Sequence, residues 1–285
     1  MTKFYEKFEK KKPEKIIEEP PRKRAKSVRK EAQPELKFKH HAKYEDGHSF
    51  PMRLNKFIAH CGICSRRDAV ELVKKGSAKV NGNTITEPGF EVMENDTVLL
   101  DGKRIEPIQK MVYILMNKPK NVITTLSDEK ARTTVMDILK NKVKERVYPV
   151  GRLDRDTTGL LLLTNDGDLA QKLSHPSHKV KKIYHVVTDR PIEESDLAAI
   201  KKGFDLEDGP VKPDRAYIIE GSQGYEIGIE IHEGRNRVVR RIFEHFKYKV
   251  VRLDRVMYAG LTKKDIPRGW FRNLTPKEVI FLKHF

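Results

Sequence analysis

Residues 151–163, with the sequence GRLDRDTTGLLLL, place a cluster of charged side chains directly before four leucines. The leucines are typical of a buried strand, whereas a carboxylate such as that of Asp154 is costly to bury without a partner. An arginine beside such a carboxylate keeps it ionised in a dry pocket, where it can act as a nucleophile or a base. Taken alone, the cluster is more often a surface salt-bridge group worth about 0–1 kcal/mol.

Three further stretches carry residues of chemical interest: NKPKNVITT at 117–125, KVKKIYHV at 179–186, and EGRNRVVRRIFEHFKYKVVRLDR at 233–255. Tyr184 offers an aromatic ring and a hydroxyl, and the arginines after residue 234 suit a carboxylate or phosphates. The segment Arg-Leu-Asp-Arg recurs at 252–255. Its Asp254 lies in an alternating pattern typical of a strand and lacks the Thr-Thr-Gly-Leu-Leu continuation, so we expect a structural role for it.

The N-terminal elements that flank these motifs follow the order helix, helix, strands. Leu54, Phe57 and Ile58 form one helical face that ends near Gly62, and residues 65–76 begin with Ser65 and Asp68 at capping-box spacing. Asn-Gly at 81–82 and Asp-Gly at 101–102 are strong signals for two-residue hairpin turns. We expect a small helix–helix–β-hairpin domain over residues 51–110.

Residues 111–285 predict a second domain of mixed strands and helices. A strand that leads into a loop is indicated at 111–125, further strands at 160–164, 182–188 and 225–233, and short helices at 133–140 and after the Asn-Asp-Gly turn at 165–167. We expect Asp168 to cap the latter helix, which ends before Pro176. The fold class is therefore α+β, with a mixed, mainly antiparallel sheet and flanking helices.

The charge of the chain favours a polyanionic partner. The 285 residues carry a formal net charge of +17 and a pI near 9.7, as expected for a protein that binds phosphates. An anionic membrane surface is the competing interpretation, but no apolar run reaches the roughly 20 residues that span a bilayer. The N-terminus lacks the apolar region of a signal peptide, so we expect a cytoplasmic protein.

Residues 1–50 contain 15 Lys/Arg and 9 Asp/Glu with few large aliphatic side chains. Such a composition predicts a disordered basic arm, which either sweeps RNA or only solubilises the protein. Cys61 and Cys64 form a C-x-x-C, but the sequence has no second ligand pair at zinc spacing, so we expect no metal site. Glycine-rich dinucleotide and phosphate loops are absent from the sequence, which argues against NTPases and S-adenosylmethionine-dependent methyltransferases.

The N-terminal stretch RLNKFIAHCGICSRRDAVELVKKGSAKVNG, residues 53–82, resembles the alpha-L RNA-binding motif. Basic side chains at the ends of its second predicted helix are placed to contact phosphates, since helix N-termini also attract them. An ordinary solvated basic face is the alternative. The candidate RNA-binding residues in this domain are Arg53, Lys56, Arg66, Arg67, Lys74, Lys75 and Lys79.

From residue 52 to the C-terminus the chain resembles pseudouridine synthases, and within them the RsuA/RluB branch that modifies ribosomal RNA. The resemblance rests on the GRLDRDTTGLL, KKIYHV and GRNRVVRR stretches together with NKPKN. It implies that Asp154 is the catalytic aspartate, Tyr184 the active-site tyrosine and Arg240 the basic partner of the aspartate. The RNA contacts expected in this domain are Arg152, Arg235, Arg237 and Arg241. The sequence departs from the family pattern at Asn121 and Lys247, where glycine is usual, and at Val238, where glutamine is common.

The implied reaction explains these residue types. Converting uridine to pseudouridine breaks the C1′–N1 bond and joins C1′ to C5 of the same base, so we expect neither a redox cofactor nor a metal. One carboxylate suffices because the leaving base is recaptured, unlike in glycosidases, which use two. Nucleophilic attack and proton abstraction near the 2′ carbon both remain open. The target base must be extruded from the RNA into the pocket.

We expect a monomer that acts on large-subunit (23S) ribosomal RNA, because the basic extension suits members resembling RluB. A small-subunit (16S) ribosomal RNA is the alternative substrate, and an assembling ribosomal particle the alternative to free RNA. A non-catalytic RNA-binding assembly factor on the same scaffold is the rival from another class, against which the presence of Asp154, Tyr184 and Arg240 argues. A methyltransferase with the same small module is a third alternative.

Overall fold

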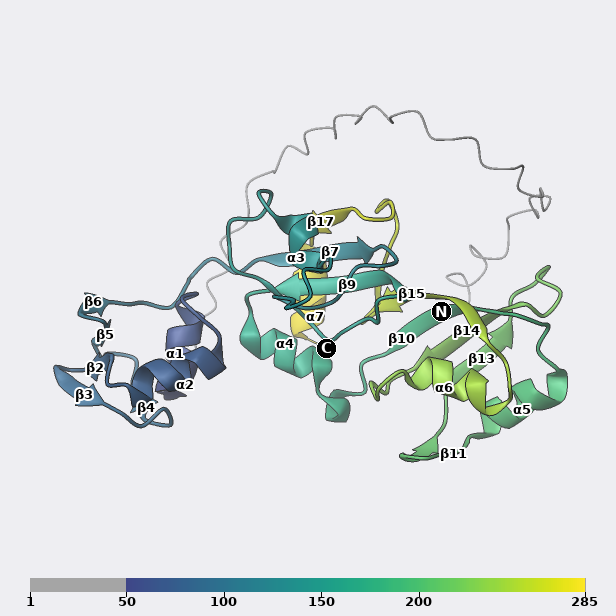
Figure 1. Ribbon diagram of the computed structural model, residues 1–285, viewed down its shortest axis with the longest axis horizontal. Coiled ribbons are helices and arrows are strands. Elements are labelled where there is room, and N and C mark those ends of the chain that lie inside the picture. The colour runs from purple at the N-terminus through teal and green to yellow at the C-terminus, as the bar shows by residue number, and fades with distance from the viewer. Residues whose placement is uncertain (1–49, 285) are drawn as a thin grey trace.

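The computed structural model describes residues 50–284, which form two α+β domains joined by a short linker (Figure 1). The basic arm expected at residues 1–50 therefore lies, except for Phe50, outside the described residues. The boundary expected near residue 110 falls between the last strand of the first domain and the first strand of the second. No helix in the described part of the chain has the length and apolar character needed to cross a membrane.

The N-terminal domain packs two helices against short strands, as the sequence predicts. Helices α1 (Leu54–His60) and α2 (Arg66–Lys74) lie beside a sheet ordered β3-β2-β5-β6, and β1 pairs with β4. Ser65 accepts a hydrogen bond from the Asp68 amide, which completes the predicted capping box. The turns at Asn81-Gly82 and Asp101-Gly102 have positive φ at both residues, as two-residue hairpins require. The strands are β1 (Met52–Arg53), β2 (Ala78–Val80), β3 (Asn83–Ile85), β4 (Glu91–Val92), β5 (Val98–Leu100) and β6 (Lys103–Arg104).

The C-terminal domain is built on a mixed sheet with strand order β13-β14-β10-β15-β9-β7-β17. All neighbours pair antiparallel except β15 and β9, which are parallel, so the predicted mainly antiparallel sheet is confirmed. The strands on this path are β7 (Tyr113–Lys118), β9 (Thr158–Thr164), β10 (Lys182–Thr188), β13 (Arg215–Ile218), β14 (Glu226–Ile231), β15 (Val250–Tyr258) and β17 (Phe271–Asn273). Strands β8 (Tyr148–Pro149) and β16 (Leu261–Thr262) extend it, and β11 (Phe204–Leu206) and β12 (Gly209–Val211) form a separate hairpin.

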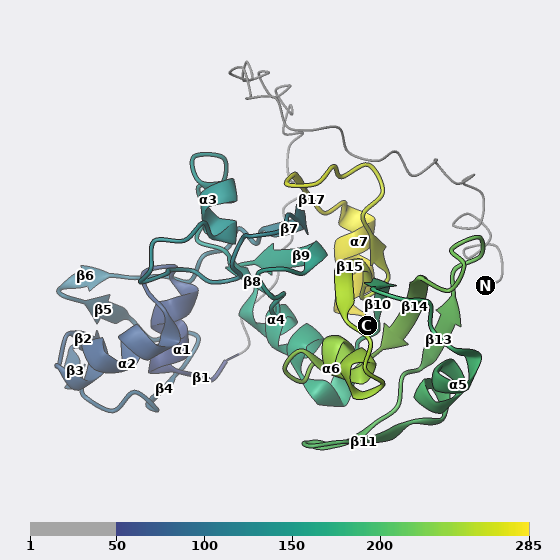
Figure 2. The same ribbon diagram turned by 45° about the vertical axis from the view of Figure 1, so that its right-hand side comes forward.

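Helices cover this sheet on both sides (Figure 2). They are α3 (Val135–Leu139), α4 (Gly167–Ser174), α5 (Glu194–Lys202), α6 (Val238–His245), α7 (Pro276–Lys283) and the 3-10 turn η2 (Pro176–His178). Helix α4 is capped by Asp166, which accepts the Leu169 amide hydrogen, and the prediction of Asp168 as its cap is wrong. Asp168 lies two residues further on, in the first turn of the helix, and bonds Lys56 of the N-terminal domain instead, at 2.7 Å.

The run of four leucines forms the centre of the sheet. Leu161 and Leu163 face one apolar cluster, and Leu160 and Leu162 face the other, because side chains alternate along a strand. All four are fully buried, which confirms the core strand expected from the sequence. The charged loop before it therefore ends at a rigid part of the fold.

Gly159 allows β9 and β15 to approach closely. It has φ +107°, and a Cβ atom at this position would overlap the carbonyl oxygen of Arg255 and lie 2.5 Å from Asp254 Oδ1. Asp254 pairs in parallel register with Thr158 and Arg255 with Gly159. The second Arg-Leu-Asp-Arg segment, at 252–255, is thereby paired with the residues that follow the first, which lies in the loop at 152–155.

Candidate active site

A cavity of about 160 Å³ lies where the loop before β9 meets β10, β15 and the start of α6. Its walls combine charged side chains with apolar ones. The lining residues are Val150, Gly151, Arg152, Leu153, Asp154, Thr157, Leu173, Ser174, Lys182, Tyr184, Glu233, Gly234, Arg235, Arg237, Val238, Val239, Leu253, Arg255 and Tyr258. Asp154 and Tyr184, which the sequence predicts to act together, are thus in one cavity, whereas Arg240 does not line it.

The backbone on both sides of Asp154 is fixed by the loop after β7. Thr124 Oγ1 donates to the Leu153 carbonyl at 2.8 Å, and the Asn121 amide donates to the Arg155 carbonyl at 2.9 Å. Asn121 adopts φ 66°, so asparagine takes the left-handed conformation for which glycine is usual here. The Asp154 side chain itself is 38% exposed and makes one loose ion pair. Its carboxylate is held in place but remains accessible to a ligand.

The arginine beside Asp154 is Arg237, and the expectation that Arg240 occupies this place is not met. Arg237 Nη1 lies 3.8 Å from Asp154 Oδ2. Helix α6 begins at Val238, with Arg237 at its N-cap in a left-handed conformation of φ 48°. Arg240 consequently falls on the buried face of the helix, where Nη1 donates to the Val250 carbonyl at 3.1 Å. In this position Arg240 ties α6 to β15.

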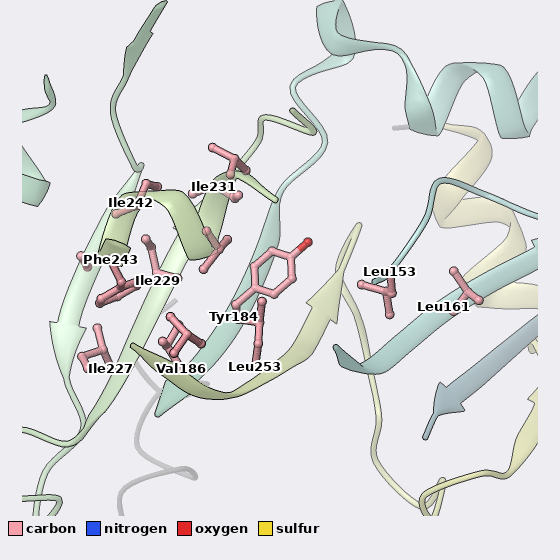
Figure 3. Packing of buried hydrophobic residues seen from close by; sticks show 14 of the residues in the cluster. Leu153, Leu161, Tyr184, Val186, Ile227, Ile229, Ile231, Ile242, Phe243 and Leu253 are labelled. Atoms are coloured by element: carbon pink, nitrogen blue, oxygen red, sulfur yellow. The ribbon is translucent and has the colours of Figure 1, made fainter. Parts of the chain in front are cut away.

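Tyr184 forms part of the wall between the cavity and the larger apolar cluster. It lies on β10, its side chain is buried, and it packs with Val186, Ile229 and Leu253. Figure 3 shows the ring beside Leu253, with the hydroxyl pointing away from Ile227. An aromatic ring in the wall of a cavity can stack on a planar base.

The sequence motifs did not single out two lysines near the site, the buried Lys118 and the half-buried Lys182. Lys118 donates to the carbonyls of Pro119 and Val122 at 3.0 and 2.7 Å, and burial lowers its pKa to about 8. Lys182 donates to the carbonyls of Val180, His232 and Glu233 at 3.1, 2.8 and 3.3 Å, and burial likewise lowers its pKa to about 8. Lys182 stands two residues before Tyr184, and this spacing along a strand is a signal for a shared face.

Some of the predicted RNA-binding side chains are exposed, and others form ion pairs within the protein. Arg53, Arg66, Arg67, Lys74, Lys75, Lys79 and Arg152 are exposed. Lys56 instead bonds Asp168 across the domain interface. Arg235 and Arg241 both bond Asp208 in the β11–β12 turn, at 2.9 and 2.8 Å, and Arg235 also bonds Glu233. These two arginines therefore hold the β11–β12 hairpin against the loop that carries Arg237.

The C-x-x-C spacing lies in the turn between α1 and α2. Burial raises the pKa of the Cys61 thiol to about 12, so it stays protonated near neutral pH. Within residues 50–284, no group of three or more potential metal ligands comes together. Arg146, from the C-terminal domain, donates instead to the Cys64 carbonyl at 2.9 Å.

Comparisons with known proteins agree with this architecture. Residues 112–245 match the family model for RNA pseudouridylate synthase, and residues 52–98 match the S4 domain. Ribosomal large subunit pseudouridine synthase B of Bacillus subtilis (strain 168) is 43% identical over 230 residues, which cover 80% of this chain and 93% of the relative. The chain therefore belongs to the RNA pseudouridylate synthase family. It is an RNA pseudouridine synthase, an isomerase, with an S4 domain at its N-terminal side.

Two further similarities extend over most of the described chain. Dual-specificity RNA pseudouridine synthase RluF of Escherichia coli (strain K12) is 35% identical over 233 residues, covering 81% of this chain and 78% of the relative. A crystal structure of a pseudouridylate synthase superposes with a TM-score of 0.60 at 29% identity, covering 81% of this chain and 99% of that chain. These findings confirm the resemblance to the RsuA/RluB branch drawn from the sequence motifs.

Proposed function

We propose that this protein isomerises a uridine of large-subunit (23S) ribosomal RNA to pseudouridine, with Asp154 as its catalytic carboxylate. The observation that carries the assignment is the position of Asp154. Its backbone is fixed on both sides, its carboxylate is accessible, and it shares a cavity with the ring of Tyr184. A single carboxylate in such a cavity fits a reaction in which the leaving base is retained.

Each side chain has a distinct task in this proposal. Asp154 acts at the ribose, either on C1′ or on the proton at the 2′ carbon. Arg237, at 3.8 Å, places a positive charge beside that carboxylate, and this charge acts more strongly once RNA excludes water from the cavity. Tyr184 stacks on the extruded uracil and holds it near C1′ while C5 turns toward the sugar. The Arg240 side chain supports Arg237 indirectly by fixing α6 on β15.

The proposed substrate follows from charge and from the relatives. Arg66, Arg67, Lys74, Lys75 and Lys79 are exposed on the S4 domain, which suits contacts with the phosphates of folded RNA. The Bacillus subtilis relative is a large subunit pseudouridine synthase by name, which favours 23S over 16S RNA. The protein would act as a monomer in the cytoplasm, on free ribosomal RNA or on an assembling particle.

The test uses unmodified 23S and 16S transcripts incubated with wild-type protein, Asp154→Asn or Asp156→Asn. Pseudouridine is mapped by carbodiimide modification and primer extension. We expect one new stop on the 23S transcript with the wild type and with Asp156→Asn, a matched control two residues away on the exposed side of the loop. The stop should be absent with Asp154→Asn. A stop that survives Asp154→Asn would show that another carboxylate acts, and a stop on 16S alone would overturn the choice of substrate.

A further inference from the structure

Arg255 is positively charged and lines the cavity, but the proposed function assigns it no role. It lies on β15 directly opposite Tyr184 of β10, and residues that face each other across a strand pair share a face of the sheet. A register shift between Ile183 and Tyr184 lets Tyr258 face the same way, opposite Lys182. The side chains of Arg255, Tyr258, Lys182 and Tyr184 therefore meet at the cavity, and all four line it.

The guanidinium of Arg255 is almost completely removed from solvent. The residue is 2% exposed, Nε donates to the Leu160 carbonyl at 2.8 Å, and Cζ lies 4.5 Å from the centre of the Tyr258 ring. These contacts fix the plane of the guanidinium on one side. They leave the far nitrogens directed away from the Leu160 carbonyl, because the donors of arginine form a rigid planar fork.

One nitrogen of this fork, Nη2, is buried and has no hydrogen-bond acceptor among the described residues. No described carboxylate forms an ion pair with Arg255 either. The neighbouring Lys182 differs, since its ammonium donates to three carbonyl oxygens. A buried charge without a partner is unfavourable, and such a group in a native fold calls for an explanation.

The walls around Arg255 favour a base over a phosphate as the missing acceptor. Val150, Leu173 and Leu253 are apolar, and Tyr184 and Tyr258 add two flat rings. Uracil is planar and carries its two carbonyl oxygens at the ring edge, whereas a phosphate would have to lose its hydration among these side chains. The remaining buried donor without a partner in this cavity, Thr157 Oγ1, is a second polar group at the same apolar walls.

The isomerisation places negative charge on such an acceptor. When C1′–N1 breaks, its electron pair goes to N1 and is delocalised onto the O2 and O4 carbonyl oxygens of uracil. The C5–C1′ bond then forms with an electron pair of the base, a proton leaves C5, and N1 gains a proton. Atoms and electrons are conserved, and the step is easier if a fixed cation meets the oxygen on which charge develops.

We propose that the extruded uracil, on entering the cavity, displaces the side chains that cover Nη2 of Arg255, and that Nη2 then donates to a ring carbonyl oxygen and stabilises the negative charge on the detached base. This inference rests on the proposed function and adds a further catalytic residue to it. Asp154 acts at the sugar side of the bond that breaks, and Arg255 acts at the base side. The two lie on segments that Gly159 allows to come together.

The experiment uses target RNA with uridine, 2-thiouridine or 4-thiouridine at the modified position, because sulfur is a weak hydrogen-bond acceptor. Single-turnover rate constants and RNA Kd values are measured for wild-type protein, Arg255→Met and the control Arg252→Met, which removes an exposed arginine of the same strand. Product is quantified by chromatography of the digested RNA. Thermal unfolding of each variant checks that it is folded.

We expect Arg255→Met to lower the rate constant about 100-fold, the effect of removing one preorganised donor to a developing anion, with Kd changed less than about twofold. One of the two thio substitutions should slow the wild type and Arg252→Met but have no further effect on Arg255→Met. Equal thio effects in the wild type and Arg255→Met would overturn the inference, as would a full rate with weakened Kd, which indicates a phosphate contact.

Two outcomes separate this inference from the proposed function. If the wild type forms no pseudouridine in any transcript, the proposed function fails. If the wild type is active and Arg255→Met is equally active, only the role of Arg255 fails. If Arg255→Met does not fold, the rates of the wild type with the two thio substrates still test the inference. Full rates with both would contradict a hydrogen bond to either carbonyl oxygen.

Discussion

The sequence Arg-Leu-Asp-Arg occurs twice in this protein, at 152–155 and 252–255, and its two copies are used in opposite ways. Both place a leucine, Leu153 or Leu253, in the same apolar cluster. The first copy lies in a loop and the second in the central part of β15. Because the four letters are identical, every difference between the copies arises from the backbone and the neighbours.

The aspartates differ in their partners. Asp154 has one loose contact with Arg237 at 3.8 Å and a side chain that is 38% exposed. Asp254 has a side chain that is 13% exposed, accepts two hydrogen bonds of 3.1 Å from Arg268 and bonds Lys263. These cationic donors outweigh the burial of its carboxyl and lower its pKa to about 2. A carboxylate with its oxygens already bound is unavailable for chemistry, which agrees with the structural role expected for Asp254.

The last arginines of the two copies differ in the opposite way, because here the residue of the second copy is the one available to a ligand. Arg155 is exposed and does not line the cavity, whereas Arg255 is buried and does. The loop copy thus presents its carboxylate to the cavity, and the strand copy presents its guanidinium. The comparison of the two copies shows how a motif acquires its chemistry. The fold leaves one residue of each copy without a close ion-pair partner among the described residues, and that residue is the one available to a ligand.

The largest expected effect separates the two aspartates by activity. Asp154→Asn should lower the rate of pseudouridine formation at least about 10³-fold, as removal of an essential nucleophile or base does. Its thermal midpoint should stay close to that of the wild type, because one loose, partly exposed ion pair contributes little to stability. Single-turnover kinetics and a thermal melt of the same preparation measure both. A large fall in the midpoint would show that Asp154 is a structural residue like Asp254.

Asp254→Asn should show the opposite pattern. The substitution leaves Lys263 and Arg268 without their carboxylate. We expect a loss of about 3 kcal/mol in the free energy of unfolding, at the lower end for a broken buried pair because both cations are partly in water. Urea denaturation measures it, and activity per folded molecule should fall far less than for Asp154→Asn. Unchanged stability would contradict the assignment of Asp254 to the fold.

Acid should expose the same difference. The folded pKa of Asp254 is about 2 and the ordinary value is 3.8, so the unfolded chain binds the proton first as the pH falls. The contribution of Asp254 is therefore complete above about pH 4 and is lost between about pH 4 and 2, amounting to about 2 kcal/mol. Urea titrations from pH 6 to 2 should show wild type and Asp254→Asn converging at low pH. Parallel curves would mean that Asp254 is not the titrating group.

Features set by neighbouring residues could be predicted from the sequence. The capping box at Ser65, the Asn81-Gly82 turn and the alternation of the strand that carries Tyr184 depend on residues one to four positions apart. The resemblance placed Asp154 and Tyr184 at the site, and the cavity contains both.

The identity of the arginine beside Asp154 could not be predicted in this way. It depends on the left-handed N-cap at Arg237, which decides where α6 begins and so which side chain turns toward the loop. The burial of Arg255 depends on a parallel pairing with Gly159, about 95 residues away, and on a register shift in β15. Asp166 rather than Asp168 caps α4 because the helix starts at Gly167.

The smallest expected effect concerns Arg155, compared with Arg255 at the same position of the second copy. The backbone carbonyl of Arg155 accepts a hydrogen bond from the Asn121 amide, whereas its side chain is exposed. Arg155→Met should therefore leave the single-turnover rate within about threefold of the wild type, and any loss should appear in the Kd for RNA, with a salt slope smaller by about 1 if the side chain meets a phosphate. Titrations at several salt concentrations measure this, with Arg155→Lys as the control that keeps the charge. Arg155→Met could instead slow the reaction as much as Arg255→Met. In that case the burial of Arg255 does not distinguish its function from that of Arg155, and the residue that stabilises the charge on the base lies in the loop and not in the strand.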